Sequence, residues 1–414
     1  MELVVKLAQH TPIIHFQWDQ DGAILRASEL KPKLDKYLKE KNIPELKELF
    51  GAKGNLPYKL SVQSEDKIKI GNNEIPDRYP LFFGNLHAEK RKKFAIYNCT
   101  ELKFVSFYPE VIEVIKKYIP EFLFVTNFGT RQSKGFGSFY IKKDDALYKN
   151  PADFKDYYSF TVDVGGPDLY SIYNNLFYSI DLFYRTLRSG INIKDRDDKK
   201  KTIFYFKSLM FQYCKSKSWT WDKKAIKEKF VDKTELYNQK KDYPNSDVLN
   251  FSGEKAYLVR DLLGLAPLQN YMWYKLEEYN NRSFSIQYDK SNEIQRFMSP
   301  ILFKPLLEDK DKFRVFIVLT PVANEMFDKQ FKINKVVKIS KDETKPLDDM
   351  ELSTPPAGSF NSNEFFDFSL STIEEIGIDK YIDPGFQNTN EFRTIKNIYD
   401  QLISQKKVRD KNGK

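Results

Sequence analysis

A glycine-rich segment, FGTRQSKGFGSF, carries the residues best suited to chemistry in this sequence. Its glycines, Gly129, Gly135 and Gly137, bracket the cations Arg131 and Lys134. Glycine lets the backbone adopt left-handed conformations and approach a ligand closely, while the cations can contact phosphate oxygens. Successive main-chain N–H groups in such a loop can also cradle an anion. The pattern is typical either of a phosphate-binding loop or of an ordinary β-turn with solvated cations.

Nucleotide-cofactor motifs do not fit this segment. A Walker loop has GxxxxGK and then Ser or Thr at the start of a helix, whereas this loop leads into the strand-like run Ser138–Ile141. The spacing GxGxxG is missing as well. The two cysteines, Cys99 and Cys214, form no CxxC pair. We therefore expect no cofactor, no zinc site and a reducing compartment.

Candidate catalytic residues are scarce. Only three histidines occur, and His15, with Lys31 or Tyr37, is the one combination that could act as general acid and base in metal-independent RNA cleavage. A strand histidine beside a proline is more often structural. Asp19 and Asp21 have no third ligand and are typical of a turn, so no metal site is predicted. We therefore favour binding over catalysis.

Composition limits the class of protein. With 414 residues, the chain is long enough for two domains, and 41% hydrophobic and 15% aromatic residues favour a folded chain. The net charge of +9 suits a polyanionic partner such as nucleic acid without proving one. No apolar stretch is long enough to cross a membrane. We expect a cytoplasmic protein.

The elements around the glycine-rich loop predict how it is positioned. The chain opens with Glu2–Leu7 and continues through Thr11–Gln17, a run that is interrupted by Pro12 and predicts a bent or edge strand. A helix that Ser28 is expected to cap comes next, and short strands follow. A second helix over Glu110–Tyr118 and a strand over Phe122–Thr126 lead into the loop. This order is compatible with a βαββαβ ferredoxin-like domain with an inserted hairpin.

The second half of the chain predicts another unit. Its expected elements are a helix at 168–187, a helical insertion at about 190–265, strands at 283–288 and 313–319, a loop at 341–363, a helix at 390–404 and a fraying tail. The fold class is α+β. The predicted domains are 1–165 and 166–405, followed by a basic tail at 406–414.

Three segments resemble the RAMP superfamily of type III CRISPR systems. FGTRQSKGFGSF looks like the G-R-x-x-x-G-F-G-S form of the RAMP glycine-rich loop. GAILRASELKPK is similar to the LR-x-S-x-L-K segment, with Arg26, Ser28 and Lys31 at the matching positions. Arg296–Lys304 (RFMSPILFK) resembles a strand pair in the two-domain head subunit of the Cmr complex.

The resemblance implies two ferredoxin-like domains in a non-catalytic subunit of a type III-B (Cmr-type) antiviral effector. It implies binding to the 3′ region of the guide RNA, to the target RNA duplex and to neighbouring RAMP subunits in a hetero-oligomer. A guide of variable sequence must be held by its backbone, through cations, hydroxyls and main-chain amides. The residues expected to do so are Arg26, Ser28, Lys31, Gly129, Arg131, Lys134, Gly135, Gly137, Ser138, Arg296 and Lys304.

Two rival interpretations stay open. A metal-independent guide-RNA-processing endoribonuclease of the same superfamily would use His15 beside the glycine-rich loop. A pure protein scaffold would show no salt-sensitive affinity for RNA. The alternative for Lys31 and Lys33 is a solvated helix face, and for the lysines of the insertion at about 190–265 RNA, a neighbouring subunit and water all stay open.

Overall fold

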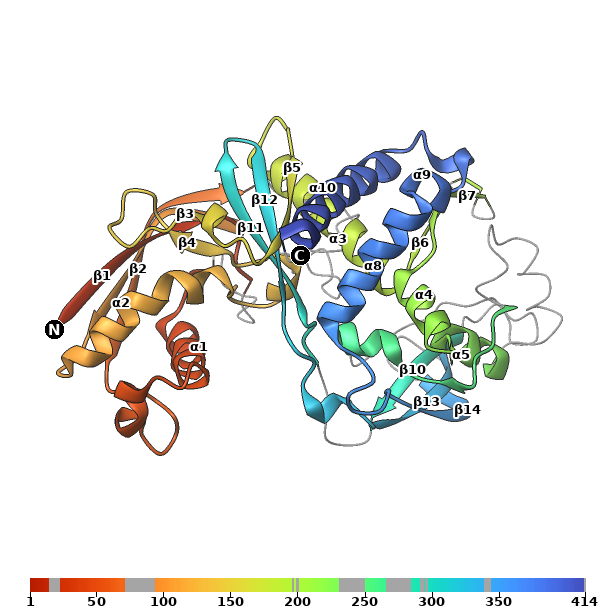
Figure 1. The fold of residues 1–414 in the computed structure, drawn as a ribbon, viewed down its shortest axis with the longest axis horizontal. Helices are drawn as coiled ribbons and strands as arrows, with labels where there is room; N and C mark the ends of the chain where they lie inside the picture. The colour runs from red at the N-terminus through yellow and green to blue at the C-terminus, as the bar shows by residue number, and fades with distance from the viewer. Residues whose placement is uncertain are drawn as a thin grey trace. The chain divides into compact units, whose positions relative to one another are not determined.

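The computed structural model describes residues 1–14, 23–70, 94–195, 197–198, 201–230, 250–265, 284–290, 294, 297–338 and 344–412 (Figure 1). They form two compact units. Unit 1 holds Met1–Asp181 and Leu302–Val318, and unit 2 holds Leu182–Ile301 and Leu319–Lys414. The two units are therefore not continuous in sequence. The domain border expected at residue 165 stays a prediction.

Unit 1 contains a four-stranded antiparallel sheet. Its strands are β1 (Glu2–Gln9), β2 (Lys59–Ile70), β3 (Phe94–Val105) and β4 (Phe139–Ile141), in the order β2-β3-β1-β4. Helix α1 (Ala27–Glu40) lies between β1 and β2 in sequence, and α2 (Pro109–Phe124) lies between β3 and β4. This is the element order and strand order of a ferredoxin-like βαββαβ domain. The expected fold of the first domain is confirmed.

The two helices bury their apolar residues against this sheet (Figure 1). Leu30, Leu34 and Leu38 recur at helical spacing on α1, and all three are fully buried in the core cluster that also holds Val5 and Leu7 of β1. Their spacing places them on one helix face, which is the face that the sheet must cover. The outer face of α1 is left to polar and charged residues.

Three boundaries in unit 1 differ from expectation. The opening strand ends at Gln9, and residues 11–14 are not part of a strand. Helix α1 begins at Ala27 with Arg26 as its N-cap residue, so Ser28 lies inside the first turn and is exposed. In the run expected as a strand at 122–126, Phe122, Leu123 and Phe124 instead form the buried end of α2, and Val125 is its C-cap residue. A short apolar run fits a buried helix end as well as a strand, and periodicity alone cannot separate the two.

A second sheet in unit 1 repeats part of the ferredoxin-like pattern. It consists of β5 (Tyr158–Asp163), β11 (Ile301–Asp309) and β12 (Lys312–Leu319), in the order β11-β12-β5, with β12 antiparallel to β5. Helix α3 (Leu169–Arg188) follows β5. A β-strand, a helix and a hairpin in this strand order correspond to the first four elements of a second ferredoxin-like motif, interrupted after its helix.

The interruption is not purely helical, contrary to expectation. Its described elements are β6 (Ile191–Lys194), β7 (Thr202–Phe206), α4 (Leu209–Ser216), β8 (Trp219–Thr220), α5 (Asp222–Phe230), β9 (Lys255–Ala256) and a 3-10 helix at Val259–Leu263. Strands β6 and β7 form an antiparallel hairpin. The lysine-rich composition suggested solvated helices, but the β-branched and aromatic runs INIK and TIFYF favour strands.

The remaining sheet of unit 2 includes a segment expected to be a loop. Strands β10 (Phe284–Lys290), β13 (Gln330–Lys338) and β14 (Thr344–Ser353) form an antiparallel sheet in that order. The expected loop at 341–363 is therefore partly wrong. Pro346 is accommodated because β14 is an edge strand and its register shifts opposite Lys335 and Val336.

The C-terminal helices of unit 2 are α8 (Ser362–Ile376), α9 (Ile378–Tyr381) and α10 (Asn390–Asn412). Helices α8 and α10 run side by side (Figure 1). The tail at 406–414 was expected to fray, yet α10 continues to Asn412, because Lys406 pairs with Glu374 of α8 at 3.2 Å and with Asp410 at 3.1 Å. Among the described residues, no helix is long and apolar enough to cross a membrane.

Candidate nucleic-acid interface

The glycine-rich loop of unit 1 is fastened to the segment that follows β1. The Gly137 amide donates a hydrogen bond to the Pro12 carbonyl at 2.8 Å, and the Thr130 amide donates to the Ile14 carbonyl at 2.7 Å. The Thr11 hydroxyl donates to the carbonyl of Gly135 at 2.7 Å. The loop is therefore a braced part of the fold and not a free turn.

Two glycines are required by the close approach of the backbone. Gly137 has φ +66°, and a Cβ there would lie 1.9 Å from the carbonyl oxygen of Phe128. Gly129 has φ +79°, and its Cβ would lie 2.5 Å from the carbonyl oxygen of Ile14. The expected left-handed conformations are present, but the close approach is to the protein's own backbone.

Helix α1 supplies an anion and a cation to the same loop. The Gly129 amide donates a hydrogen bond to Glu29 Oε1 at 2.6 Å. Lys33 Nζ donates to the same Glu29 oxygen at 2.9 Å, to the Asn127 carbonyl at 2.9 Å and to Gln132 Oε1 at 2.7 Å. Of the loop amides expected to hold a phosphate, that of Gly129 therefore binds an internal carboxylate, while those of Thr130 and Gly137 bind carbonyls.

The two loop cations are drawn inward. Arg131 adopts a left-handed conformation with φ 54° and is half-buried. Burial lowers the pKa of Arg131, and the charge of Asp181 opposes that shift. The ammonium nitrogen of Lys134 is buried. Of this pair, Arg131 has the more accessible cation for an outside ligand.

Ser138 and Phe136 are interior residues. The Ser138 amide donates a hydrogen bond to the Thr11 hydroxyl at 2.9 Å, and the Ser138 hydroxyl donates to the Pro305 carbonyl at 2.7 Å. Ser138 is 0% exposed. Phe136 stacks on Phe177 with ring centroids 3.9 Å apart. Both residues anchor the loop, and neither faces a ligand.

Lys304 lies in the core of unit 1 and not on a strand surface. It is 0% exposed, and its ammonium group donates to the carbonyls of Thr126 and Phe139, each at 2.8 Å. Burial, helped by the charge of Lys33, holds the pKa of Lys304 well below its usual range. The expected phosphate contact is corrected: Lys304 fastens β11 to the two ends of the loop segment.

A basic groove lies along the outer face of α1. It has a volume of about 610 Å³. Its lining residues include Ser28, Lys31, Lys36, Lys39 and Lys53. Of these, all but Lys31 are exposed. We refer to these five residues together as the α1 groove.

Lys31 forms the inner wall of the α1 groove. Its ammonium group donates to Asp35 Oδ2 at 3.0 Å and to the Leu56 carbonyl at 2.9 Å, and it lies 3.4 Å from the centre of the Tyr58 ring. Asp35 is the one acidic residue among those lining the groove, and it is 3% exposed. The exposed charge of the groove is therefore positive.

Sequence reasoning found Ser28 and Lys31 but missed Lys36, Lys39 and Lys53. Lys36 and Lys39 are three residues apart on α1, which places them on one exposed face. Lys53 comes from a loop after the helix, and only the fold brings it to the same groove. The helical spacing of the first two was a signal that could have been used.

Other expected site residues take different positions. Arg26 is half-buried at the start of α1. His15 and Arg296 lie outside the described residues, as do Asp19 and Asp21. In the described part of the chain, no group of three or more His, Cys, Asp or Glu side chains is placed to hold a metal ion.

His10 is the one histidine within the described residues. Its Nδ1 accepts a hydrogen bond from the Leu307 amide at 2.9 Å. Burial, with the charges of Lys304 and Lys143, lowers the pKa of His10 to about 3. His10 is therefore neutral at ordinary pH and carries its proton on Nε2.

Comparisons with known proteins match both halves of the chain. The family model for the Cmr1 N-terminal domain matches residues 1–191, and that for the Cmr1 C-terminal domain matches residues 205–396. No curated protein sequence matches.

Two solved structures are similar to parts of the chain. A chain in the cryo-EM structure of the type III-B Cmr-beta complex bound to cognate target RNA is 14% identical, with a TM-score of 0.24. The match covers 34% of this chain and 58% of that one, so this chain spans little more than half of that relative. The apo crystal structure of Cmr1 from Pyrococcus furiosus is 8% identical, with a TM-score of 0.35, over 86% of this chain and 99% of that chain.

Proposed function

Because this chain belongs to the Cmr1 family, a RAMP subunit family of type III-B Cmr effector complexes, we propose that it binds RNA and does not cleave it. Its partners in this proposal are guide RNA, target RNA and neighbouring subunits of the complex. The solved Cmr-beta complex is described as bound to cognate target RNA, which supports this choice of ligand.

The α1 groove carries the proposal. Lys36, Lys39 and Lys53 line it together and are exposed. Lysine ammonium groups bind phosphates as point charges. Such a surface suits a guide whose sequence varies, because it contacts the backbone alone. Ser28 adds a hydroxyl for a phosphate oxygen at the same groove.

The glycine-rich loop has a supporting role in the proposal. Glu29 accepts the hydrogen bond of the Gly129 amide, and Lys33 donates hydrogen bonds to Glu29, Asn127 and Gln132. The loop thus holds α1 at the sheet, and α1 in turn presents the lysines of the groove. Arg131, which is half-buried, is the loop residue that we assign to RNA contact.

The test compares wild type with the triple variant Lys36→Ala, Lys39→Ala and Lys53→Ala. Labelled guide-type RNA is titrated in chelator at several salt concentrations, on matched native and denaturing gels. Each lost phosphate contact removes about 0.7 from the slope of log affinity against log salt for a single strand. The triple variant should therefore bind RNA more weakly and lose about 2 from that slope.

A matched control removes the same charge elsewhere on unit 1. Lys59, Lys116 and Lys117 are exposed and lie outside the α1 groove. Their triple alanine variant should keep most of the affinity and most of the salt slope. Equal losses of RNA affinity in the two triple variants would contradict RNA binding at the α1 groove. RNA cleavage in chelator would favour the endoribonuclease interpretation. Wild type without any shift would contradict RNA binding by this chain outside the complex.

A further inference from the structure

A second basic cavity lies in unit 2, apart from the α1 groove. It has a volume of about 290 Å³, near the lower end of the range of about 300–1,000 Å³ found for small-molecule sites. Three cations line it, from α3 and α5: Arg185, Lys223 and Lys227. The residues lining this cavity include no aspartate or glutamate. A cavity of this size suits one small ligand and not a length of strand.

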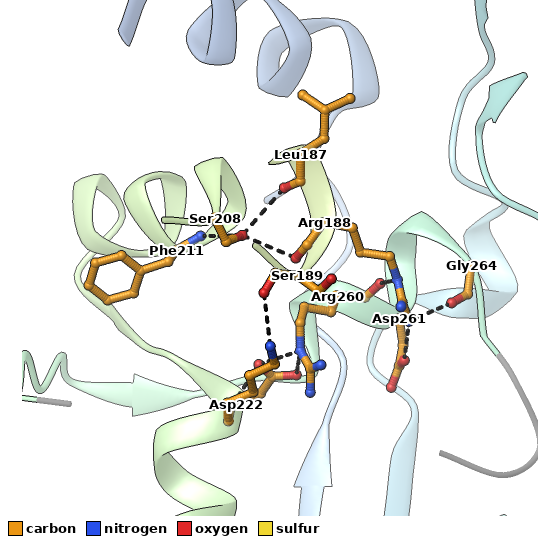
Figure 2. Close-up of polar contacts among 10 residues, drawn as sticks. Leu187, Arg188, Ser189, Ser208, Phe211, Asp222, Arg260, Asp261 and Gly264 are labelled. Atoms are coloured by element: carbon orange, nitrogen blue, oxygen red, sulfur yellow. Dashed lines mark hydrogen bonds and ion pairs between the residues drawn. The ribbon is translucent and has the colours of Figure 1, made fainter. Parts of the chain in front are cut away.

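Two buried aspartates of unit 2 are engaged by arginines (Figure 2). Asp222 accepts two hydrogen bonds from Arg260 Nε, at 2.8 and 2.7 Å, and is 0% exposed. Asp261 lies 3.5 Å from a terminal guanidinium nitrogen of Arg188. The cavity therefore adjoins two internal ion pairs that use the local negative charge.

The two lysines of α5 face the cavity from successive turns of the helix. Lys223 and Lys227 are four residues apart, so like charges are brought together on one helix face, which by itself is unfavourable. Lys227 is 6% exposed, and burial lowers its pKa to about 8. Lys223 donates to the Ser189 carbonyl at 2.8 Å. An anion in the cavity would offset the repulsion and the desolvation of both ammonium groups.

Aromatic and polar groups complete the wall. Phe211 and Trp221 lie edge to face with centroids 6.0 Å apart, and both line the cavity. Tyr205, Ser208 and other lining residues come from β7 and the start of α4. The wall combines cations and hydroxyls for anionic oxygens with apolar ring surface, which is the composition of a site for a small organic phosphate.

We propose that the cavity lined by Arg185, Lys223 and Lys227 binds a phosphate group, free or at the end of a nucleotide chain. The site stands on the cavity and its charges alone, and it shares no residue with the α1 groove. Lys227 and Arg185 contact the phosphate oxygens, and the rings of Phe211 and Trp221 bound the apolar side.

The experiment is calorimetric titration of the full chain with three probes. These are inorganic phosphate, a short oligoribonucleotide with a terminal 3′-phosphate, and the same oligonucleotide with a 3′-hydroxyl. Binding of inorganic phosphate supports the site. Tighter binding of the phosphorylated oligonucleotide than of its hydroxyl form assigns the phosphate to a strand end, and equal affinity for both oligonucleotides assigns it to free phosphate. Absence of binding by inorganic phosphate and by the phosphorylated oligonucleotide overturns the proposal.

Variants of α5 give the matched comparison. Lys227→Met should weaken phosphate binding at least about ten-fold, because a charge-assisted hydrogen bond is lost. Lys229→Met removes the same charge from the same helix at a residue that does not line the cavity, and its affinity should stay within about two-fold. An equal loss in both variants overturns the proposal.

Two further measurements test whether a loss of phosphate binding reflects misfolding, and whether the cavity binds phosphate independently of the α1 groove. Lys227→Arg keeps the charge and should retain phosphate binding, and phosphate should raise the melting temperature of wild type but not of Lys227→Met. The triple variant of Lys36, Lys39 and Lys53 should keep wild-type phosphate affinity even where it loses RNA. If that triple variant loses phosphate binding, the proposal of a phosphate site separate from the α1 groove is overturned.

Discussion

The carboxylate of Glu29 accepts a 2.6 Å hydrogen bond from the main-chain amide of Gly129. A helix in the first half of unit 1 thereby supplies the anion for a glycine-rich loop one hundred residues later in the chain. The ammonium group of Lys33 forms an ion pair with the same Glu29 carboxylate at 2.9 Å. The Gly129 amide and the Lys33 ammonium group are satisfied internally, which leaves the exposed lysines of the α1 groove and the half-buried Arg131 as the cations that we assign to RNA contact.

Replacing Glu29 with glutamine should lower the stability of the protein. Glu29→Gln removes the charge from a hydrogen bond and an ion pair whose side chains are 22% and 27% exposed. We expect the free energy of unfolding to fall by about 1–3 kcal/mol in urea titrations. The control is Glu40→Gln, whose partner Lys36 is 3.7 Å away with both side chains largely exposed, and it should change by less than about 0.5 kcal/mol. Equal effects would mean that the Gly129 contact is unimportant.

A side chain at residue 137 should not fit. Gly137→Ala places a Cβ 1.9 Å from the Phe128 carbonyl oxygen, and we expect a loss of about 3 kcal/mol or more. Gly54→Ala is the matched control in the same unit. Gly54 has φ +73°, and the nearest atom to its Cβ is the mobile end of Lys39 at 3.4 Å, so only the conformational cost of about 1 kcal/mol remains. Thermal unfolding of the two variants measures the difference, and similar melting temperatures would count against the close approach.

Lys304→Met should affect stability and leave RNA binding unchanged. The substitution leaves the carbonyls of Thr126 and Phe139 without their donor, at a cost of about 1–3 kcal/mol. Lys312→Met on β12 removes an exposed lysine and should cost less than about 0.5 kcal/mol. Denaturant titration and gel shifts are measured on the same preparations. A loss of RNA affinity as large as that of the α1 groove variant would show that the Lys304 ammonium group reaches RNA.

His10 should make the protein less stable as the pH falls. Its pKa is about 3 in the folded protein and about 6.5 in the unfolded chain, so only the unfolded chain takes up the proton between these values. The stability due to neutral His10 is complete above about pH 6.5 and is lost as the pH falls towards 3. His10→Asn keeps a side-chain acceptor for the Leu307 amide but does not titrate. The measurement is the free energy of unfolding of both proteins between about pH 7 and pH 4. Identical slopes would exclude His10 as the cause.

The sequence alone determined the architecture of the first domain and the identity of its loop. Leu30, Leu34 and Leu38 fix the buried face of α1, because helical spacing is a local property that the residues express by themselves. The glycines at 129 and 137 were likewise recognisable, since left-handed backbone geometry favours glycine wherever it occurs. The run at 122–126 was misassigned because local pattern does not separate a buried strand from a buried helix end.

Only the tertiary structure decided which charges are available to a ligand. Lys304 and Lys36 are the same residue type, yet one is 0% exposed between two carbonyls and the other has a side chain that is 78% exposed. Lys53 reaches the α1 groove, and Arg185 reaches the cavity of Lys227, through contacts between elements distant in sequence. Burial and pairing depend on what the rest of the chain places around a side chain, and local sequence does not contain that information.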